Sequence, residues 1–125
     1  MQYYTKSDEI LTLNNDGQLS AIPHSRYKSF VVNLIEECKK HGFYLVRTND
    51  GEMRFTGKKM FENILQTDED YLTFANEKNE RMSFYCLYGN EIWETIADYG
   101  FSEATEKTAD EVFNEISDRF QNIYA

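Results

Sequence analysis

The sequence predicts an α+β fold, a single domain in which about four helices pack on an antiparallel sheet of short hairpins. Three observations support this expectation. Apolar residues recur at helical intervals in some segments and alternate along others, and turn-forming residues separate the two kinds. The length is typical of one domain, here residues 1–125. Nine Phe, nine Tyr and one Trp provide enough apolar surface for a core, despite a net charge of −9.

The N-terminal part is expected to contain two short strands and then a helix. The strands lie within Glu9 to Ile22, around the turn-forming run Asn14-Asn15-Asp16-Gly17. From Ser25 onward, apolar residues form one helical stripe, namely Tyr27, Phe30, Val31, Leu34, Ile35 and Cys38. Pro23 fits the position before this helix, and Gly42 fits the left-handed residue that follows its end.

A first hairpin and a short helix are predicted next. Phe43 to Thr48 and Glu52 to Phe55 are apolar runs on either side of the turn Asn49-Asp50-Gly51. Apolar residues in Lys58 to Gln66 then return to helical intervals. We therefore expect two antiparallel strands followed by a short helix.

A second hairpin follows an acidic turn. Asp68-Glu69-Asp70 is expected to be a solvated turn, because three adjacent carboxylates favour water. Tyr71 to Ala75 and Arg81 to Tyr88 alternate in the manner of half-buried strands, and the polar residues between them provide the loop.

Two helices are predicted at the C-terminal end. Glu91 to Tyr99 has apolar residues at helical intervals, with Asn90 as a suitable N-cap and Gly100 as a suitable C-cap. The last helix is expected to open with a capping box over Thr108 to Glu111. Its apolar stripe consists of Val112, Phe113, Ile116, Phe120 and Ile123.

Charge is distributed unevenly along the chain. Residues 1–59 contain nine Lys or Arg and seven Asp or Glu, a net charge of +2, whereas residues 60–125 contain four and fifteen, a net charge of −11. Such a field affects association and solubility rather than fold. The C-terminal half is therefore the candidate binding region.

Two rows of carboxylates at helical spacing are the candidate partner-binding residues. They are Glu91, Glu94, Asp98, Glu111, Glu115 and Asp118. Carboxylates spaced in this way can imitate the phosphates of a nucleic-acid backbone, so a basic protein is the expected partner, in particular one that itself binds nucleic acid. The alternative interpretation is a solvated helix surface that only keeps the protein soluble.

No catalytic residue is predicted. Cys38 and Cys86 lie among apolar residues and are expected to be reduced core thiols. His24 and His41 stand at the two ends of the first helix, where His41 fits a C-terminal cap better than a general base. The sequence contains no G-x-S-x-G, glycine-rich phosphate loop or H-E-x-x-H motif. We therefore expect a protein that is not an enzyme.

Metal, cofactor, nucleic-acid and membrane sites are not expected either. Asp68-Glu69-Asp70 lacks the ligand pattern of a calcium loop, and two Cys with two His at unrelated spacings do not match a zinc site. An isoelectric point of about 4.7 argues against direct nucleic-acid binding. No signal peptide or apolar run of about 18 residues is present, which leaves the cytoplasm as the expected location.

In size, acidity and lack of catalytic motifs, the chain resembles the small inhibitors encoded by phages and plasmids. These include anti-CRISPR and anti-restriction proteins, and acidic immunity proteins that block nuclease toxins are similar. The resemblance is one of class and rests on no specific motif. The predicted function is an acidic, non-enzymatic interaction protein of the nucleic-acid-mimic kind. The alternatives are a small-molecule-binding or structural module with a solubilising acidic surface and, third, a metal-dependent enzyme.

Overall fold

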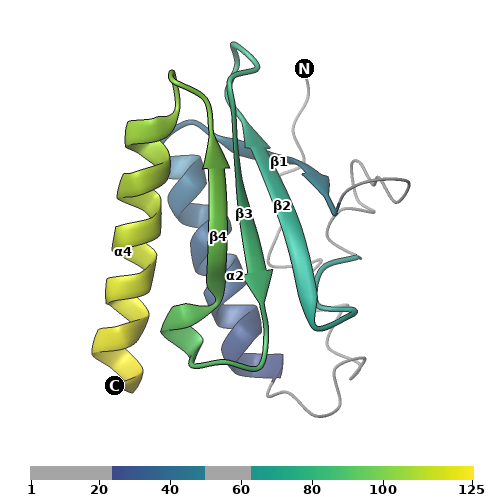
Figure 1. Cartoon of the computed structure of the whole chain (residues 1–125), viewed down its shortest axis with the longest axis vertical. Coiled ribbons are helices and arrows are strands. Elements are labelled where there is room, and N and C mark those ends of the chain that lie inside the picture. Colours follow the sequence, from purple (N-terminus) through teal and green to yellow (C-terminus); the bar gives the residue numbers. More distant parts are fainter. Residues whose placement is uncertain (1–23, 50–62) are drawn as a thin grey trace.

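The computed structural model describes residues 24–49 and 63–125, the first three as backbone alone. These residues form two layers, a four-stranded antiparallel sheet and two helices on one of its faces (Figure 1). In chain order the elements are α2 (His24–Lys40), β1 (Tyr44–Thr48), β2 (Glu69–Ala75), β3 (Arg81–Leu87), the 3-10 helix η1 (Ile92–Glu94), β4 (Ile96–Phe101) and α4 (Glu106–Tyr124).

Helix α2 forms and ends as the sequence predicts. The six residues of its apolar stripe are all buried. Beyond its end, the Phe43 N–H donates to the Cys38 carbonyl at 2.9 Å and the Gly42 N–H donates to the Lys39 carbonyl at 2.9 Å. These two bonds form a C-terminal glycine cap, in which the chain leaves the helix through a residue in the left-handed conformation. That residue is Gly42, which has a φ of +80°. The cap directs the chain into β1.

The sheet has the strand order β1-β2-β3-β4, and all neighbours are antiparallel. The predicted hairpin of β2 and β3 is confirmed, with Leu72 opposite Phe84 and Phe74 opposite Met82. In its turn, the Asn76 side-chain oxygen accepts from the Lys78 N–H at 3.1 Å and from the Glu80 N–H at 2.9 Å. These bonds fix the register of the two central strands.

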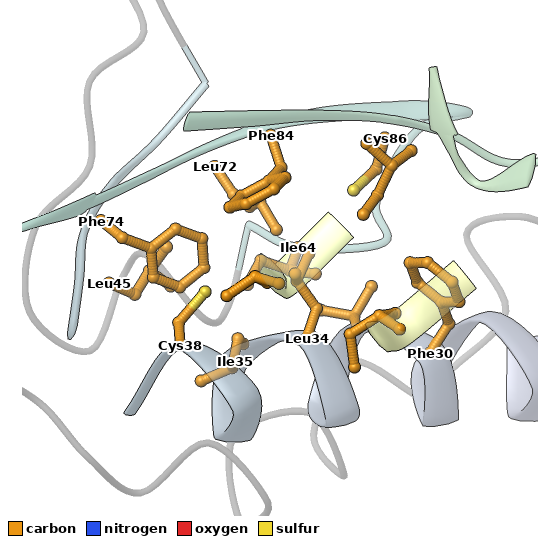
Figure 2. Close-up of a cluster of buried hydrophobic side chains, with 14 of the residues drawn as sticks. Phe30, Leu34, Ile35, Cys38, Leu45, Ile64, Leu72, Phe74, Phe84 and Cys86 are labelled. Atoms are coloured by element: carbon orange, nitrogen blue, oxygen red, sulfur yellow. The ribbon is translucent and has the colours of Figure 1, made fainter. Parts of the chain in front are cut away.

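The core lies between the sheet and the helices (Figure 2). Alternate residues of the two central strands face it, because successive side chains of a strand point to opposite sides. The inward and fully buried residues are Leu72, Phe74, Met82, Phe84 and Cys86. Phe30 of α2 contacts Phe120 of α4 with ring centroids 5.0 Å apart, so both helices share this core.

The helix predicted over Glu91 to Tyr99 is wrong. This segment forms η1 and then β4, so the described residues contain two α-helices rather than about four. Ile92 in η1 and Ile96 at the start of β4 are 1% and 5% exposed, and their spacing imitated a helical stripe. Pairing with β3 satisfies the main-chain groups on one side of β4, and this tertiary gain overrides the local pattern. Gly100, predicted to cap the helix, lies in β4 opposite Ser83.

Two helix boundaries also differ from the prediction. Helix α4 begins at Glu106 rather than at Thr108, since the buried Thr105 holds the preceding turn. Its hydroxyl donates to the Arg81 carbonyl at 2.8 Å and accepts from the Ser102 N–H at 2.9 Å. Residues 63–66, at the end of the helix predicted for Lys58 to Gln66, form a turn.

Three of the predicted segments lie wholly or partly outside the described residues. These are the strands within Glu9 to Ile22, the strand Glu52 to Phe55 and the start of the helix at Lys58. In the described part of the chain, β1 pairs with β2 through Leu45 opposite Phe74 and Thr48 opposite Leu72.

Candidate functional site

The outward side of α4 carries three of the predicted carboxylates. Glu111, Glu115 and Asp118 are exposed, and the residues that α4 buries on its other side are Ala109, Val112, Ile116 and Phe120. The helical period explains this separation, because the acidic and apolar positions fall on different sides of one helix. We call these three residues the α4 acidic row.

One member of the α4 acidic row is tied to the helix layer. Arg119 donates to Glu115 and to Glu37 of α2, both at 2.9 Å, and also to the side-chain oxygen of Asn33 at 2.9 Å. Glu37 is 8% exposed. Burial raises its pKa, but the hydrogen bonds and charges of Arg119 and Lys40 outweigh burial and lower the pKa below its ordinary value. Arg119 therefore links α4 to α2 through hydrogen bonds and an ion pair.

The other predicted row is not a row in the structure. Glu91 and Glu94 are exposed at η1, which packs against α4. Asp98 is exposed in β4 opposite Tyr85, whose side chain points to the sheet face away from the helices. Glu94 and Asp98 are separated because Asp98 lies in a strand. Residues four positions apart share a face of a helix, but β4 is not helical.

Asp70 is a buried carboxylate, although the sequence predicted a solvated turn. It is 1% exposed, and its Oδ2 accepts from the Tyr88 hydroxyl at 2.6 Å and from the Leu65 N–H at 2.8 Å. Burial raises the pKa of Asp70 to about 6, while hydrogen bonds from Tyr88, Leu65 and Asn49 limit the rise. The carboxylate holds the turn at residues 63–66 and the end of β3 against β2. The alternation of inward and outward side chains along β2 could have predicted this burial, since Asp70 lies on the same face of the strand as the buried Leu72.

The cysteines and histidines considered in the sequence analysis are not arranged as nucleophile and base. Cys38 and Cys86 are buried free thiols, which confirms the prediction for both. Burial raises the pKa of each thiol, and the charge of Glu37 adds to the effect at Cys38, so both remain protonated at neutral pH. His41 lies at the exposed end of α2, with its Nε2 3.6 Å from Glu37. The side chain of His24 lies outside the described residues.

The sheet face opposite the helices holds a pocket that the sequence analysis did not predict. The register places Arg47, Thr73, Ser83 and Gly100 side by side across all four strands. These residues and Arg81 line a shallow pocket of about 310 Å³, which we call the sheet pocket. Its signal in the sequence was weak, because the register of four strands is needed to bring the residues together.

Comparisons with known proteins give no lead. No protein-family model matches the chain, and neither a curated protein nor a solved structure matches it significantly.

Within residues 24–49 and 63–125, no group of three or more His, Cys, Asp or Glu side chains is arranged to hold a metal ion. None of the helices in this part is long and apolar enough to cross a membrane.

Proposed function

We propose that this chain is a non-enzymatic interaction protein that binds a basic surface of another protein through the outward side of α4. The observation that carries the proposal is the α4 acidic row, in which all three carboxylates are exposed. In the described part of the chain, only Glu115 of the three has an ion-pair partner. Residues 103–124 contain six acidic and two basic residues, so the charge of this region is not balanced locally.

The spacing of the row fits a partner that accepts phosphates. Glu111 and Asp118 are seven positions apart, which is about 10 Å along a helix at ~1.5 Å per residue. Over the same length, one strand of a nucleic-acid duplex carries about three phosphates, since it has one per ~3.4 Å. The three carboxylates thus match the axial spacing of phosphates on one strand, not on a duplex, and the charges of Glu111 and Asp118 are the two without an ion-pair partner among the described residues. Glu91 and Glu94 at η1 add charge beside α4.

Apolar residues at the end of α4 complement these charges. Ile123 is 63% exposed and Tyr124 is 39% exposed. The Tyr124 ring stacks on the buried Phe120, with centroids 6.1 Å apart and an interplanar angle of 4°. A tyrosine held in this way loses little conformational freedom on binding and suits an interface anchor. Charge would guide association, and these two residues would add contact area.

The proposal includes a cytoplasmic location and an inhibitory role of the kind played by phage- and plasmid-encoded inhibitors. The inhibitory role rests on the acidity of this surface and on the class resemblance described above, and the location is the expectation given in the sequence analysis. A protein that occupies the nucleic-acid site of its partner needs no active site of its own.

The test is a double charge reversal, Glu111→Lys with Asp118→Lys. Both side chains are exposed, so the fold should be retained. The partner is first captured from host lysate with the wild-type protein, identified, and then purified for titration. We expect the double variant to bind it at least about tenfold more weakly at low salt, because two attractive contacts become repulsive. Wild-type binding should also weaken with salt, as the Debye length falls from ~10 Å at 0.1 M to ~3 Å at 1 M.

The matched control is Asp68→Lys with Glu77→Lys. It changes net charge equally at exposed positions outside α4 and η1. We expect it to bind the partner as the wild type does. An equal loss of affinity in both double variants would show that only net charge matters, and an affinity indifferent to salt would contradict the proposal.

A further inference from the structure

Nine of the described residues line the sheet pocket, and they include two arginines and no acidic residue. Arg47 comes from β1 and Arg81 from β3, and both side chains lie on the face opposite the helices. This is unusual in a chain with 22 acidic and 13 basic residues. The pocket and the α4 acidic row occupy different sides of the molecule, so an inference about the pocket goes beyond the proposed function.

Neither arginine of the sheet pocket has a carboxylate partner in the described part of the chain. Arg47 Nε is buried without any hydrogen-bond partner. Arg81 Nε donates to the neutral side-chain oxygen of Asn79 at 3.2 Å. Arg119 differs sharply, because it is held by Glu37 and Glu115. The partly buried guanidinium of Arg47 is costly without a counter-charge, and a bound anion would offset that cost.

Hydroxyl groups between the arginines add hydrogen-bond donors. Thr73 is 4% exposed, and its Oγ1 is buried without a partner. The Ser83 and Tyr71 hydroxyls lie 3.0 Å apart, so between them they retain a proton to donate. Because Thr73 Oγ1 is closed off from solvent in the free protein, a ligand reaches it only after the pocket side chains shift.

Gly100 keeps this part of the pocket open. A Cβ at this position would lie 3.0 Å from Ser83 Oγ, which is closer than ordinary contact. A side chain on β4 would therefore crowd the hydroxyl that a ligand needs.

We propose that the sheet pocket binds a small molecule through an oxyanion group, a phosphate or a carboxylate. The guanidinium groups of Arg47 and Arg81 hold the charge, and the hydroxyls of Thr73 and Ser83 complete its hydrogen bonds. A volume of about 310 Å³ is at the lower end for ligand pockets, which limits the occupant to a small metabolite.

The experiment is a titration of the ¹⁵N-labelled full chain with inorganic phosphate and, separately, with acetate at constant ionic strength. We expect saturable shifts of the backbone amides of Thr73, Ser83 and Gly100. The anion that binds more tightly identifies the oxyanion. Arg47→Gln and Arg81→Gln should each weaken binding about tenfold, since each removes a charged hydrogen-bond donor. Arg81 is exposed, so its variant should fold.

Two further variants make the test specific to the pocket. Lys107→Gln removes one positive charge from an exposed position on α4 and should bind as the wild type does. Thr73→Val keeps the branched shape and the charge. It should weaken anion binding and raise the melting temperature of the free protein, because a buried unsatisfied hydroxyl is removed.

Three results would overturn the proposal. They are shifts that rise without saturation for both anions, equal weakening in Lys107→Gln and the arginine variants, and wild-type affinity in all three pocket variants. None of these results depends on the α4 acidic row. Failure of the pocket and failure of the proposed protein interface are therefore distinguishable.

Discussion

The two faces of the sheet are built from the same strands but differ in the side chains that they carry. Toward the helices, β2 and β3 present aromatic and aliphatic side chains that are fully buried (Figure 2). Toward the other side, they present hydroxyls, tyrosines and an arginine, which include Tyr71, Ser83 and Arg81. Residues that are neighbours in sequence thus belong to different environments.

This comparison shows why net charge describes neither surface of the molecule. The chain as a whole has a charge of −9, yet the described residues that line the sheet pocket include two arginines and no acidic residue. Helix α4 and η1 instead carry more acidic than basic residues. A function argued from net charge therefore concerns the helix side of the molecule, and the pocket requires an argument of its own.

The largest effect that separates the two faces is expected for Phe84→Ala against Tyr85→Ala. Phe84 is fully buried, and its replacement should lower the free energy of unfolding by about 3–5 kcal/mol through a cavity and lost contacts. Tyr85 is partly exposed on the other face, where its hydroxyl donates to Glu69 at 2.6 Å, and its replacement should cost far less than that of Phe84. Urea unfolding measures both. Similar losses would contradict the assignment of the two faces.

Much of the fold could be predicted because local patterns reflect which face is buried. The stripe of α2, the hairpin of β2 and β3 and most of the stripe of α4 follow from periodicity. The prediction of Ile123 as part of the α4 stripe is wrong, since this residue lies in the last turn of the helix and is 63% exposed. The pattern failed at Ile92 and Ile96, where two short elements meet. Their shared burial results from packing of η1 and pairing of β4, both of which depend on residues distant in sequence.

The candidate sites divide in the same way. Exposure of Glu111 and Asp118 could be predicted because one helix fixes their spacing relative to its apolar stripe. Asp98 could not be placed, since its position depends on strand pairing. The sheet pocket needed the pairing of all four strands to bring Arg47 near Gly100, and Asp70 needed the turn around Leu65 to supply its partners.

A second, smaller effect compares the arginines on the two sides of the molecule. Arg119→Met should lower the free energy of unfolding by about 2 kcal/mol, because the largely buried Glu37 loses its closest partner. Arg81→Gln should change it by less than about 0.5 kcal/mol, since that side chain is exposed and has no carboxylate to leave behind.

A double-mutant cycle sharpens this comparison. Adding Glu37→Gln to Arg119→Met should restore part of the loss, because the uncompensated buried charge is then removed. The measurement is urea unfolding of the four proteins at one pH. Additive losses would mean that Arg119 and Glu37 do not stabilise each other, and the contact between α2 and α4 would then depend mainly on apolar packing such as that of Phe30 on Phe120.

The smallest of the three effects is a pH dependence that distinguishes Asp70 from its neighbour Glu69. Asp70 faces the helices and is buried, whereas Glu69 is exposed. Burial raises the pKa of Asp70 to about 6, above the ordinary value of 3.8 that it has in the unfolded chain. The folded state therefore holds the proton more tightly. The resulting stabilisation is complete below about pH 4 and is lost as the pH rises through about 6.

Urea unfolding at two pH values tests this prediction. Between about pH 5 and about pH 7.5, ionisation of Asp70 should lower the free energy of unfolding by about 1.4 kcal/mol. Asp70→Asn should lack this loss, because its amide oxygen still accepts from Tyr88 and Leu65 but cannot ionise. Glu69→Gln is the comparison at the neighbouring position and should keep most of the wild-type loss, slightly reduced because the Glu69 charge makes a small contribution to the raised pKa of Asp70. Equal pH dependence in wild type and Asp70→Asn would show that Asp70 ionises as readily when folded as when unfolded, so the helix-covered face would not exclude water at this carboxylate.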